Sequence, residues 1–413
     1  MTEINKLKIF NDPIYGFITI PNTLIYDLIQ HPYFQRLRRI TQMGLSYLVY
    51  PGANHTRFHH ALGCMHLMQK AVDVLRFKGV FISEEEKNAL YIAILLHDIG
   101  HGPFSHTMEK TIVEEVHHEE ISLLFMEHLN KEFEGQLDLA IQVFKGEYHR
   151  KFMLQLISSQ LDMDRMDYLK RDSFYSGVAE GNVNSERLIQ MMNVVDDVLV
   201  IEEKGIYSVE KFLMSRRLMY WQAYLHKTSL VAELILTKVL KRAKELTTKG
   251  IELPCSEPLM YFMQNRITLE TFNSKNLDLF AQLDDFDVIS ALKAWQNNED
   301  FILSTLSSMI INRDLLKIIL SSEKPTITDL ELLREKFAIE NNISVQDTNY
   351  FIFKGKIKNQ AYSMEAEPIR ILKKDRSVED VFESPDQLNL KSLSKSVTKY
   401  YICFPKQLEQ IKI

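Results

Sequence analysis

Cysteine is rare in this chain: there are three in 413 residues. Cys64, Cys255 and Cys403 lie far apart and form neither the close spacing of a cysteine metal site nor the even set of a disulfide framework. Scattered free cysteines are typical of a reducing compartment. We therefore expect a cytoplasmic protein without structural disulfides.

Long apolar runs and an excess of positive charge are also lacking. No run reaches the roughly 18 residues that a membrane span needs, and the N-terminus has no signal-peptide core. The formal net charge is −6, which argues against a dominant nucleic-acid-binding surface. We expect no membrane partner, and nucleic acid is not the favoured partner. An anionic ligand in a local basic pocket is compatible with this charge balance.

Glycine is scarce, with 14 residues, and most of the sequence follows the period of amphipathic helices. A turn at 11–16 and a short strand at 17–20 are predicted before the first helix. Pro32 must bend or restart that helix, because proline has no backbone N–H to donate. Ser83 and Glu86 form a capping box, which predicts a helix start. Helices are predicted at residues 22–43, 56–77, 83–98, 105–130, 152–172 and 209–249.

β-structure is predicted in two places. Strands at 198–201 and 206–209 flank a Glu-Glu-Lys-Gly sequence and predict a hairpin. After Pro254, helices continue to about residue 340, and β-rich segments follow at 350–357, 368–372 and 400–404. The predicted fold class is mainly α. A helical core with small β-hairpins occupies 1–255, and a C-terminal α+β region occupies 256–413.

His97 and Asp98 form the most informative dipeptide. They close an apolar run at 89–96 and precede a glycine-rich break at 99–103. A neutral imidazole and a carboxylate are both ligands for divalent metals. Adjacent residues of a regular helix point about 100° apart, so the glycines must loosen the backbone if both are to reach one ion. The dipeptide indicates a metal site, and through a metal-activated water it indicates a hydrolase.

Ten of the 13 histidines lie between His55 and His128, so the dipeptide has candidate partners. A single histidine after an apolar run is more often a core or capping residue, but the clustering favours metal ligands. An upstream histidine and a downstream aspartate complete a His…His-Asp…Asp set. Composition does not choose between His59 and His60. Nor does it choose among Asp162, Asp164, Asp167 and Asp172.

Three motifs surround these residues: NHTRFHHALG at 54–63, LHDIGHGPFSH at 96–106 and LDMDRMDYLKRD at 161–172. They resemble the motifs of HD-domain phosphohydrolases, and within them the deoxynucleoside triphosphate triphosphohydrolase branch. The resemblance runs from about residue 9 to 250, and YYICFP at 400–405 is similar to a closing strand of these proteins. Further matching segments are NDPIYG at 11–16, FQRLRRITQMG at 34–44 and AYLHK at 223–227.

The resemblance implies an HD-domain helical core that binds a divalent metal. The ion would be manganese, magnesium, iron, nickel or zinc, because such ions accept mixed imidazole and carboxylate ligands. The metal-motif region is about 50–175. The implied ligands are His60, His97, Asp98 and Asp164.

The resemblance also implies groups that protonate the leaving oxygen. Histidine titrates in the useful range for this task. His106 is expected beside the leaving 5′-oxygen, and His101, His118 and Glu109 are expected as a supporting relay. His117 and His128 are interpreted as solvated surface histidines on an acidic helix.

A triphosphate needs fixed cations even in an acidic chain. The candidates are Arg57, Arg165, Arg216 and Lys227, and arginine offers phosphate a planar fork that lysine lacks. Arg57 precedes His60 by one helical turn, so both can face one cavity. Arg165 stands where the family commonly has lysine. Arg216 matches the family's phosphate-contacting arginine.

The sugar is expected to lie against a wall of polar and aromatic side chains. Asp164, Tyr168 and Asp172 recur every four residues and share one helix face. By resemblance, Tyr168 contacts phosphate or sugar, and Asp172 and Gln42 bond the 3′-hydroxyl. Tyr224 resembles the tyrosine that packs against the 2′ carbon and excludes ribose.

Some family members are homo-oligomers with an allosteric nucleotide site at a subunit junction. Asn11, Gln35, Arg38 and, in the same set, Lys227 match residues of that site. Gln30 replaces the acidic residue that reads guanine, and Phe17 replaces a polar residue. A homo-oligomer, dimer or tetramer, is therefore expected, with a regulatory nucleotide of unassigned base.

The leading hypothesis is a metal-dependent enzyme that converts a deoxynucleoside triphosphate to deoxynucleoside and inorganic triphosphate. One alternative is an HD phosphodiesterase or nuclease. Another is a non-catalytic nucleotide- or nucleic-acid-binding regulator that retains the fold. The complete ligand set and His106 favour an enzyme, and Gln42, Tyr168, Asp172 and Tyr224 favour the nucleotide substrate.

Overall fold

The computed structural model describes residues 8–104, 111, 113, 116–325, 327–363, 365–383 and 394–408, and the side chains of 327–329 are not included. Helices dominate and the strands are short, which confirms the mainly α prediction. None of the described helices is long and apolar enough to cross a membrane.

The chain begins with a small antiparallel hairpin, as the turn and strand predictions required. β1 (Ile9–Asp12) pairs with β2 (Gly16–Thr19). Asp12 Oδ1 accepts the backbone N–H groups of Ile14 and Tyr15 at 2.9 and 3.0 Å. Gly16 has a φ of +78°, a value that favours glycine. The Asp12 carboxylate and Gly16 together close the turn.

The first helix restarts at Pro32, as predicted, but ends earlier than predicted. α1 (Thr23–Gln30) is followed by α2 (Pro32–Gln35) and the 3₁₀ turn η1 (Arg36–Arg39). The prediction of helix to residue 43 was wrong, because Thr41 pairs with Thr56 in a β-bridge. Gln42 therefore lies outside a helix, just before the 3₁₀ turn η2 (Gly44–Leu48).

The helices predicted at 56–77 and 83–98 are present with shifted bounds, but the helix predicted at 105–130 begins only at His118, and the described residues 111, 113, 116 and 117 are not helical. The capping box of Ser83 and Glu86 is formed at the start of α4. The single helix predicted at 152–172 is two helices, because Asp162 starts a new one by accepting the N–H of Arg165 at 2.7 Å. Their bounds are α3 (Arg57–Phe77), α4 (Glu84–Leu96), α6 (His118–Glu132), α7 (Asp138–Lys145), α8 (Lys151–Ile157), α9 (Met163–Ser176) and α10 (Ser185–Met191).

The hairpin predicted at 198–201 and 206–209 was wrong in its pairing. β4 (Val198–Glu202) pairs instead with the preceding β3 (Met192–Val195). The turn is Asp196-Asp197, with φ values of 49° and 62°, which short polar side chains tolerate. The second predicted strand is the start of α11 (Ile206–Met219).

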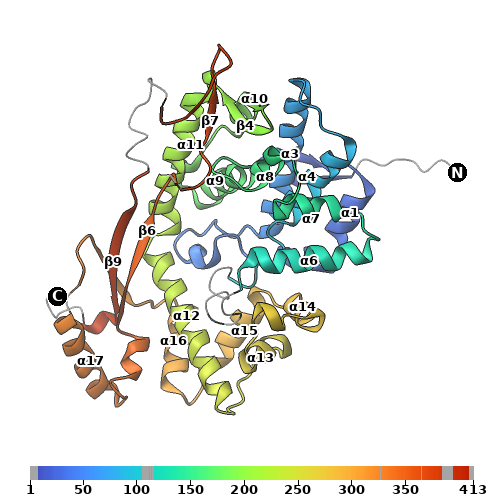
Figure 1. Cartoon of the computed structure of the whole chain (residues 1–413). Helices are drawn as coiled ribbons and strands as arrows, with labels where there is room; N and C mark the ends of the chain where they lie inside the picture. Colours follow the sequence, from blue (N-terminus) through green and yellow to red (C-terminus); the bar gives the residue numbers. More distant parts are fainter. Residues whose placement is uncertain are drawn as a thin grey trace.

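The long helical stretch predicted at 209–249 is interrupted. After α11 the backbone makes a π-helical turn, η5 (Tyr220–Tyr224), and α12 (Lys227–Thr248) follows. His226 caps α12 by accepting the N–H of Thr228 at 3.2 Å. In Figure 1, α11 and α12 form a long column between the metal-motif helices and the strands β6 and β9.

The remaining chain is α+β, and a strand interrupts the helices expected up to residue 340. β5 (Lys317–Ser321) and β6 (Phe353–Asn359) flank β9 (Val397–Phe404) in one antiparallel sheet. β7 (Arg370–Leu372) runs parallel to β4 and, with β8 (Val378–Asp380), extends the β3–β4 hairpin. The helices are α13 (Glu257–Gln264), α14 (Ser274–Phe280), α15 (Asp285–Trp295), α16 (Phe301–Ile311) and α17 (Ile327–Asn341).

Asp285, at the start of α15, holds two loops of the metal-motif region. Its Oδ2 accepts the N–H and the hydroxyl of Thr41 at 2.8 and 2.7 Å. Its Oδ1 accepts the N–H of Phe104 at 2.8 Å. The segment after residue 255 therefore positions both the loop that carries Gln42 and the loop that follows His101.

Candidate active site

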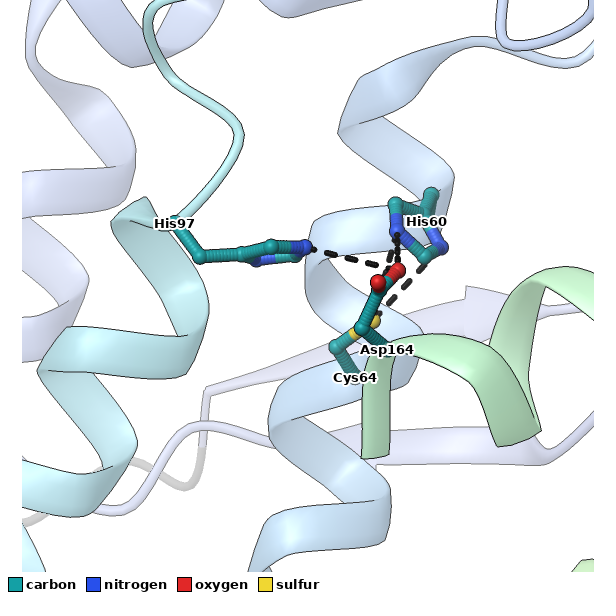
Figure 2. A group of neighbouring side chains, drawn as sticks. All are labelled: His60, Cys64, His97 and Asp164. Atoms are coloured by element: carbon teal, nitrogen blue, oxygen red, sulfur yellow. Dashed lines mark hydrogen bonds and ion pairs between the residues drawn. The ribbon is translucent and has the colours of Figure 1, made fainter. Parts of the chain in front are cut away.

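Four predicted metal ligands come together from three helices. His60 lies in α3, His97 and Asp98 follow α4, and Asp164 lies in the first turn of α9. His60 Nε2 is 3.1 Å from Asp164 Oδ1 and 3.6 Å from Asp98 Oδ2. His97 Nε2 is 3.5 Å from Asp98 Oδ1 and 3.6 Å from Asp164 Oδ1. Figure 2 shows His60 and His97 pointing toward the Asp164 carboxylate.

The loop after α4 allows both His97 and Asp98 to face this point. Ser122 of α6 donates to the carbonyl of His97 at 2.8 Å and accepts the N–H of Gly100 at 2.9 Å. A Cβ on Gly100 would lie 2.2 Å from the carbonyl oxygen of His118. Only glycine permits this close approach to α6, which is a packing role and differs from the loosening of the backbone that the sequence predicted.

The His97 imidazole fits a metal ligand. Its Nδ1 lies 2.7 Å from the carbonyl oxygen of Ile94, so the Nδ1 proton is used in that bond. Its Nε2 is buried and has no hydrogen-bond partner among the described residues. A ring held through one nitrogen, with the other nitrogen bare and aimed at two carboxylates, is typical of a histidine that binds a divalent cation.

Both candidate acidic ligands are ionised at neutral pH. Burial alone would raise the pKa of Asp164, but the His60 and His97 imidazoles, whose Nε2 atoms lie 3.1 and 3.6 Å from its Oδ1, hold this pKa below its ordinary value. Burial also opposes ionisation of Asp98, and the nearby His97 and Arg57 hold its pKa well below the usual range. Two carboxylates and two imidazoles thus present a donor set that suits a divalent metal.

The geometry distinguishes residues that composition left equivalent. His59 Nδ1 lies 3.2 Å from the N–H of Thr56 and contributes to the start of α3, away from the cluster. Asp162 caps α9, and Asp167 Oδ2 lies 2.7 Å from His60 Nδ1, on the far side of that ring. His60 and Asp164 are therefore the members that face His97.

Cys64 also lies beside His60, a neighbour that the sequence analysis did not consider. Its Sγ is 3.5 Å from each ring nitrogen of His60, which places the sulfur over the ring face rather than in line with the Nε2 lone pair. Burial raises the pKa of the Cys64 thiol well above its ordinary value, so it is protonated. Packing explains this cysteine better than ligation does.

The predicted proton relay is partly described. His101 Nε2 is 3.3 Å from Asp98 Oδ1, and the His101 ring stacks on His118 with centroids 3.8 Å apart. Burial, with the positive charge of Arg57, lowers the pKa of His101 well below its ordinary value. His106 and Glu109 lie outside the described residues.

Three of the predicted phosphate-binding groups are arginines that contacts with the protein hold in place. Arg57 forms an ion pair with Asp98 Oδ2 and is 5% exposed. Arg216 donates to the carbonyl of Ala361 at 3.1 Å, while its buried Nε has no hydrogen-bond partner among the described residues. Arg165 donates from Nε to the carbonyl of Ser159 at 2.5 Å.

Tyr168 lies between these arginines. Burial raises its pKa far above the ordinary value, Tyr220 raises it further, and the charges of Arg216 and Arg165 act in the opposite direction. Lys227, in contrast, is exposed at the start of α12. The structure thus places two arginines and a phenol together, and it leaves Lys227 at the surface.

Asp172 is bonded through both carboxylate oxygens. Its Oδ1 lies 2.7 Å from His55 Nε2, and its Oδ2 accepts the Tyr224 hydroxyl at 2.7 Å. The rings of Tyr168 and Tyr224 meet edge to face, with centroids 6.1 Å apart. Gln42 donates its backbone N–H to the carbonyl of His55 at 3.0 Å, and its buried Oε1 has no hydrogen-bond partner among the described residues. The predicted sugar-binding residues therefore form one cluster.

His55 is the member of this cluster that sequence reasoning missed. It is 1% exposed and stacks on Tyr175 with ring centroids 4.4 Å apart. Its position within the motif that also carries Arg57 and His60 was a usable signal. No pattern within α9 indicates that Asp172 has a histidine partner more than 100 residues away.

The predicted allosteric residues lie near the surface of the N-terminal part. Asn11 is paired with Phe17 across the β1–β2 hairpin, and both are exposed. Arg38 donates to Gln35 Oε1 at 2.8 Å, and its guanidinium lies 3.6 Å from the centroid of the Phe58 ring. A nucleotide site at a subunit junction stays a prediction here.

Comparison with known proteins places this geometry in a family. Residues 57–172 match the HD domain, and residues 183–253 match an HD associated region. Uncharacterized protein YwfO of Bacillus subtilis is 38% identical over 326 residues, covering 77% of this chain and 73% of that protein. The chain belongs to the HD-domain phosphohydrolases, on the branch that includes deoxynucleoside triphosphate triphosphohydrolases.

Two further relatives show that this is a hydrolase fold. A phosphohydrolase structure from Bacteroides thetaiotaomicron VPI-5482 has a TM-score of 0.93 and 52% identity, covering 97% of this chain and all of that one (100%). The deoxynucleoside triphosphate triphosphohydrolase SAMHD1 of Homo sapiens is 30% identical over 287 residues, which cover 59% of this chain and 46% of the human protein.

Replacement of Gly63 with alanine is expected to destabilise the protein by about 3–5 kcal/mol, because it would break a buried ion pair behind His60. A Cβ at this position would lie 2.0 Å from Asp167 Oδ1 and 2.3 Å from Arg171 Nη2. Urea denaturation measures the change. The matched control is Gly79→Ala, where a Cβ meets nothing within 4 Å and the cost is that of a φ of +88°, about 1–2 kcal/mol. Equal losses in the two variants would contradict the clash.

Proposed function

We propose that this protein hydrolyses deoxynucleoside triphosphates to deoxynucleoside and inorganic triphosphate. One observation carries the proposal: a single face of α9 presents Asp164, Tyr168 and Asp172. Asp164 lies 3.1 Å from His60, Tyr168 lies among the arginines, and Asp172 is held by His55 and Tyr224. The face thus joins a metal site, a phosphate site and a sugar site in the order in which a nucleotide would present these groups.

His60, His97, Asp98 and Asp164 would hold a divalent metal. Such an ion, when bound, acidifies a water molecule and neutralises charge on phosphoryl oxygens. Arg57 holds the Asp98 carboxylate in place through their ion pair. Arg165 and Arg216 would supply fixed positive charge for the rest of the triphosphate, and Arg216 Nε, which has no hydrogen-bond partner in the described part of the chain, would donate to a phosphate oxygen.

The leaving 5′-oxygen needs a proton, and we assign its delivery to His106, with Glu109 in support. His101 lies 3.3 Å from Asp98 and stacks on His118, so both would support this transfer as neighbours of the metal ligands. Burial lowers the pKa of His101, so its ring would act as a neutral hydrogen-bonding group.

The sugar would lie against Gln42, Asp172 and Tyr224. With both of its oxygens fixed, Asp172 offers a hydrogen-bond acceptor of set orientation to the 3′-hydroxyl. Gln42, whose buried Oε1 has no hydrogen-bond partner among the described residues, would donate from its amide NH₂ group to the oxygen of the same hydroxyl. Tyr224 would close the space next to the 2′ carbon, so deoxyribose is accepted and ribose is rejected.

Product analysis tests this proposal. The purified protein is incubated with each dNTP, each NTP, single-stranded DNA and bis-p-nitrophenyl phosphate, with Mn²⁺ or Mg²⁺, and the products are resolved by ion-exchange chromatography. We expect inorganic triphosphate and deoxynucleoside from dNTPs. Nucleoside monophosphate or cleaved DNA as the main product would indicate the phosphodiesterase alternative. No product from any substrate would indicate a binding regulator.

Arg216→Ala is expected to raise KM for a dNTP about 10–100-fold, since a hydrogen bond to a charged group contributes about 1.5–3 kcal/mol. Arg216→Lys should recover only part of this, because lysine lacks the planar fork. The matched control is Arg376→Ala, at an exposed turn between β7 and β8, which should leave KM unchanged. An unchanged KM in Arg216→Ala would remove Arg216 from the phosphate site.

We further propose a homo-oligomer, dimer or tetramer, with a regulatory nucleotide held near Asn11, Gln35, Arg38 and Lys227. The exposed Asn11 and the contact between Arg38 and Gln35 support this placement. Light scattering with and without added nucleotides tests it, and a monomer under both conditions would contradict it.

A further inference from the structure

A buried chain of charged side chains leads from the N-terminal hairpin to the candidate metal ligand His60. It begins at Asp12, whose Oδ1 closes the β1–β2 turn and whose Oδ2 accepts Arg171 Nη1 at 2.7 Å. Arg171 donates from Nε and Nη2 to the two oxygens of Asp167 at 2.9 and 3.0 Å. Asp167 Oδ2 lies 2.7 Å from His60 Nδ1.

This chain of four side chains is buried, so water does not replace the hydrogen bonds between them. Arg171, Asp167 and His60 are all 0% exposed, and Asp12 is 7% exposed. Each carboxylate of the chain faces the Arg171 guanidinium, and Asp167 also faces the His60 imidazole. Loss of any one of these groups would leave a buried charge without its partner.

The packing around these four side chains leaves space for them. Gly63 leaves the space on α3 that the Asp167–Arg171 pair fills. The Arg171 guanidinium carbon lies over the ring of Tyr15 in the hairpin turn, 5.6 Å from the centroid of that ring. The hairpin thus contacts Arg171 through both a carboxylate and an aromatic face.

We propose that Asp12, Arg171 and Asp167 are positioning residues through which the N-terminal hairpin sets the affinity of the metal site. When Asp167 accepts the Nδ1 proton of His60, the Nε2 atom, 3.1 Å from Asp164 Oδ1, would offer its lone pair to a metal ion that these two residues share. Arg171 orients Asp167 by a two-point contact, and Asp12 orients Arg171 from the hairpin. The inference rests on the metal role of His60 in the proposed function, and it does not depend on the substrate.

A consequence is that the hairpin and the metal site are coupled in both directions. Asn11, a predicted allosteric residue, is adjacent to Asp12 in β1. A ligand or partner that shifts the hairpin would change metal affinity, and metal binding would stabilise the hairpin to the same degree. Through this coupling, a ligand at the proposed regulatory site would change the affinity of the metal site.

Titration calorimetry of the full-length metal-free protein with Mn²⁺ alone tests the inference. We expect Asp167→Asn to weaken the Kd for Mn²⁺ about 10–100-fold, as substitutions behind a metal-binding histidine generally do. We expect Asp12→Asn to weaken it about fivefold or more. An asparagine at position 12 can still accept the turn N–H groups but loses its charge toward Arg171. Asp12→Glu, which keeps that charge, should recover part of the affinity.

The matched control is Arg242→Gln, which breaks a shielded ion pair between α12 and Asp300 far along the chain. It should lower stability in urea and leave the Kd for Mn²⁺ unchanged. A wild-type Kd for Mn²⁺ in a folded Asp12→Asn protein would overturn the proposal that the hairpin sets metal affinity. An equal weakening of Mn²⁺ binding in Arg242→Gln would show that the effect follows from lower stability and not from the position of His60.

Two outcomes separate this inference from the proposed function. If the wild-type protein binds Mn²⁺, and Asp12→Asn weakens it, but no dNTP is hydrolysed, the inference stands and the substrate assignment fails. If dNTPs are hydrolysed with Mn²⁺ and Asp12→Asn leaves the Kd unchanged, the substrate assignment stands and the inference fails.

Discussion

Asp164→Ala and His60→Ala are each expected to reduce kcat/KM for a dNTP about 10³-fold or more. The effect is large because the two side chains lie 3.1 Å apart at the centre of the cluster and supply an anion and an imidazole. A bound metal contributes several kcal/mol to such reactions, and each 1.36 kcal/mol is a factor of ten in rate. Triphosphate release from a dNTP, at saturating Mn²⁺, is the measurement.

His59→Ala is the matched control for this prediction. His59 adjoins His60 in the sequence, but its ring lies at the start of α3 beside Thr56. Its loss should lower stability by about 1 kcal/mol, the usual contribution of a helix cap, and leave turnover unchanged. Turnover at the wild-type rate in His60→Ala, or its loss in His59→Ala, would refute the assignment of ligands.

Tyr224→Ala is expected to reduce the preference for dNTP over NTP about 10²-fold. Removal of the ring opens the space that excludes a 2′-hydroxyl, and it also takes one of the two partners from Asp172. Differences of this size are reached when a pocket no longer rejects a larger analogue. The measurement is the ratio of kcat/KM for dATP and ATP under the same conditions.

Tyr224→Phe separates the two roles of this side chain. It keeps the ring and loses only the hydroxyl that donates to Asp172 at 2.7 Å. Activity toward dATP should fall about tenfold, the size expected for a lost hydrogen bond to a charged group, while the dATP-to-ATP ratio stays near that of the wild type. A Tyr224→Ala protein that still rejects ATP would show that another group excludes ribose.

Local sequence was sufficient where one residue type imposes one backbone behaviour. Pro32 restarts the first helix, the capping box of Ser83 and Glu86 begins α4, and the turn predicted at 11–16 leads into β2. The prediction of the hairpin near residue 200 was wrong because the sequence offers two possible turns. Asp196 and Asp197 adopt the left-handed φ values that a tight turn needs, and the second predicted strand is part of α11.

The residue types of the candidate site could be predicted from the sequence, but the contacts between these side chains could not. The His97-Asp98 dipeptide, the neighbouring glycines and the four-residue spacing on α9 predicted a metal site beside polar and aromatic groups. His55 was missed, since its contact with Asp172 crosses 117 positions of sequence. Asp167 was indistinguishable from Asp164 in composition, yet it lies behind His60 and bonds Nδ1.

The sequence by itself determined that this is a mainly α HD-domain phosphohydrolase, because its motifs combine residue types and spacings that few other folds require. Only the tertiary structure decided which aspartate faces His97, which histidine holds Asp172, and how the hairpin reaches His60. The physical reason is that the packing of α9 against α3, which Gly63 permits, sets which side chains meet. No local rule specifies a contact between segments that are distant in sequence.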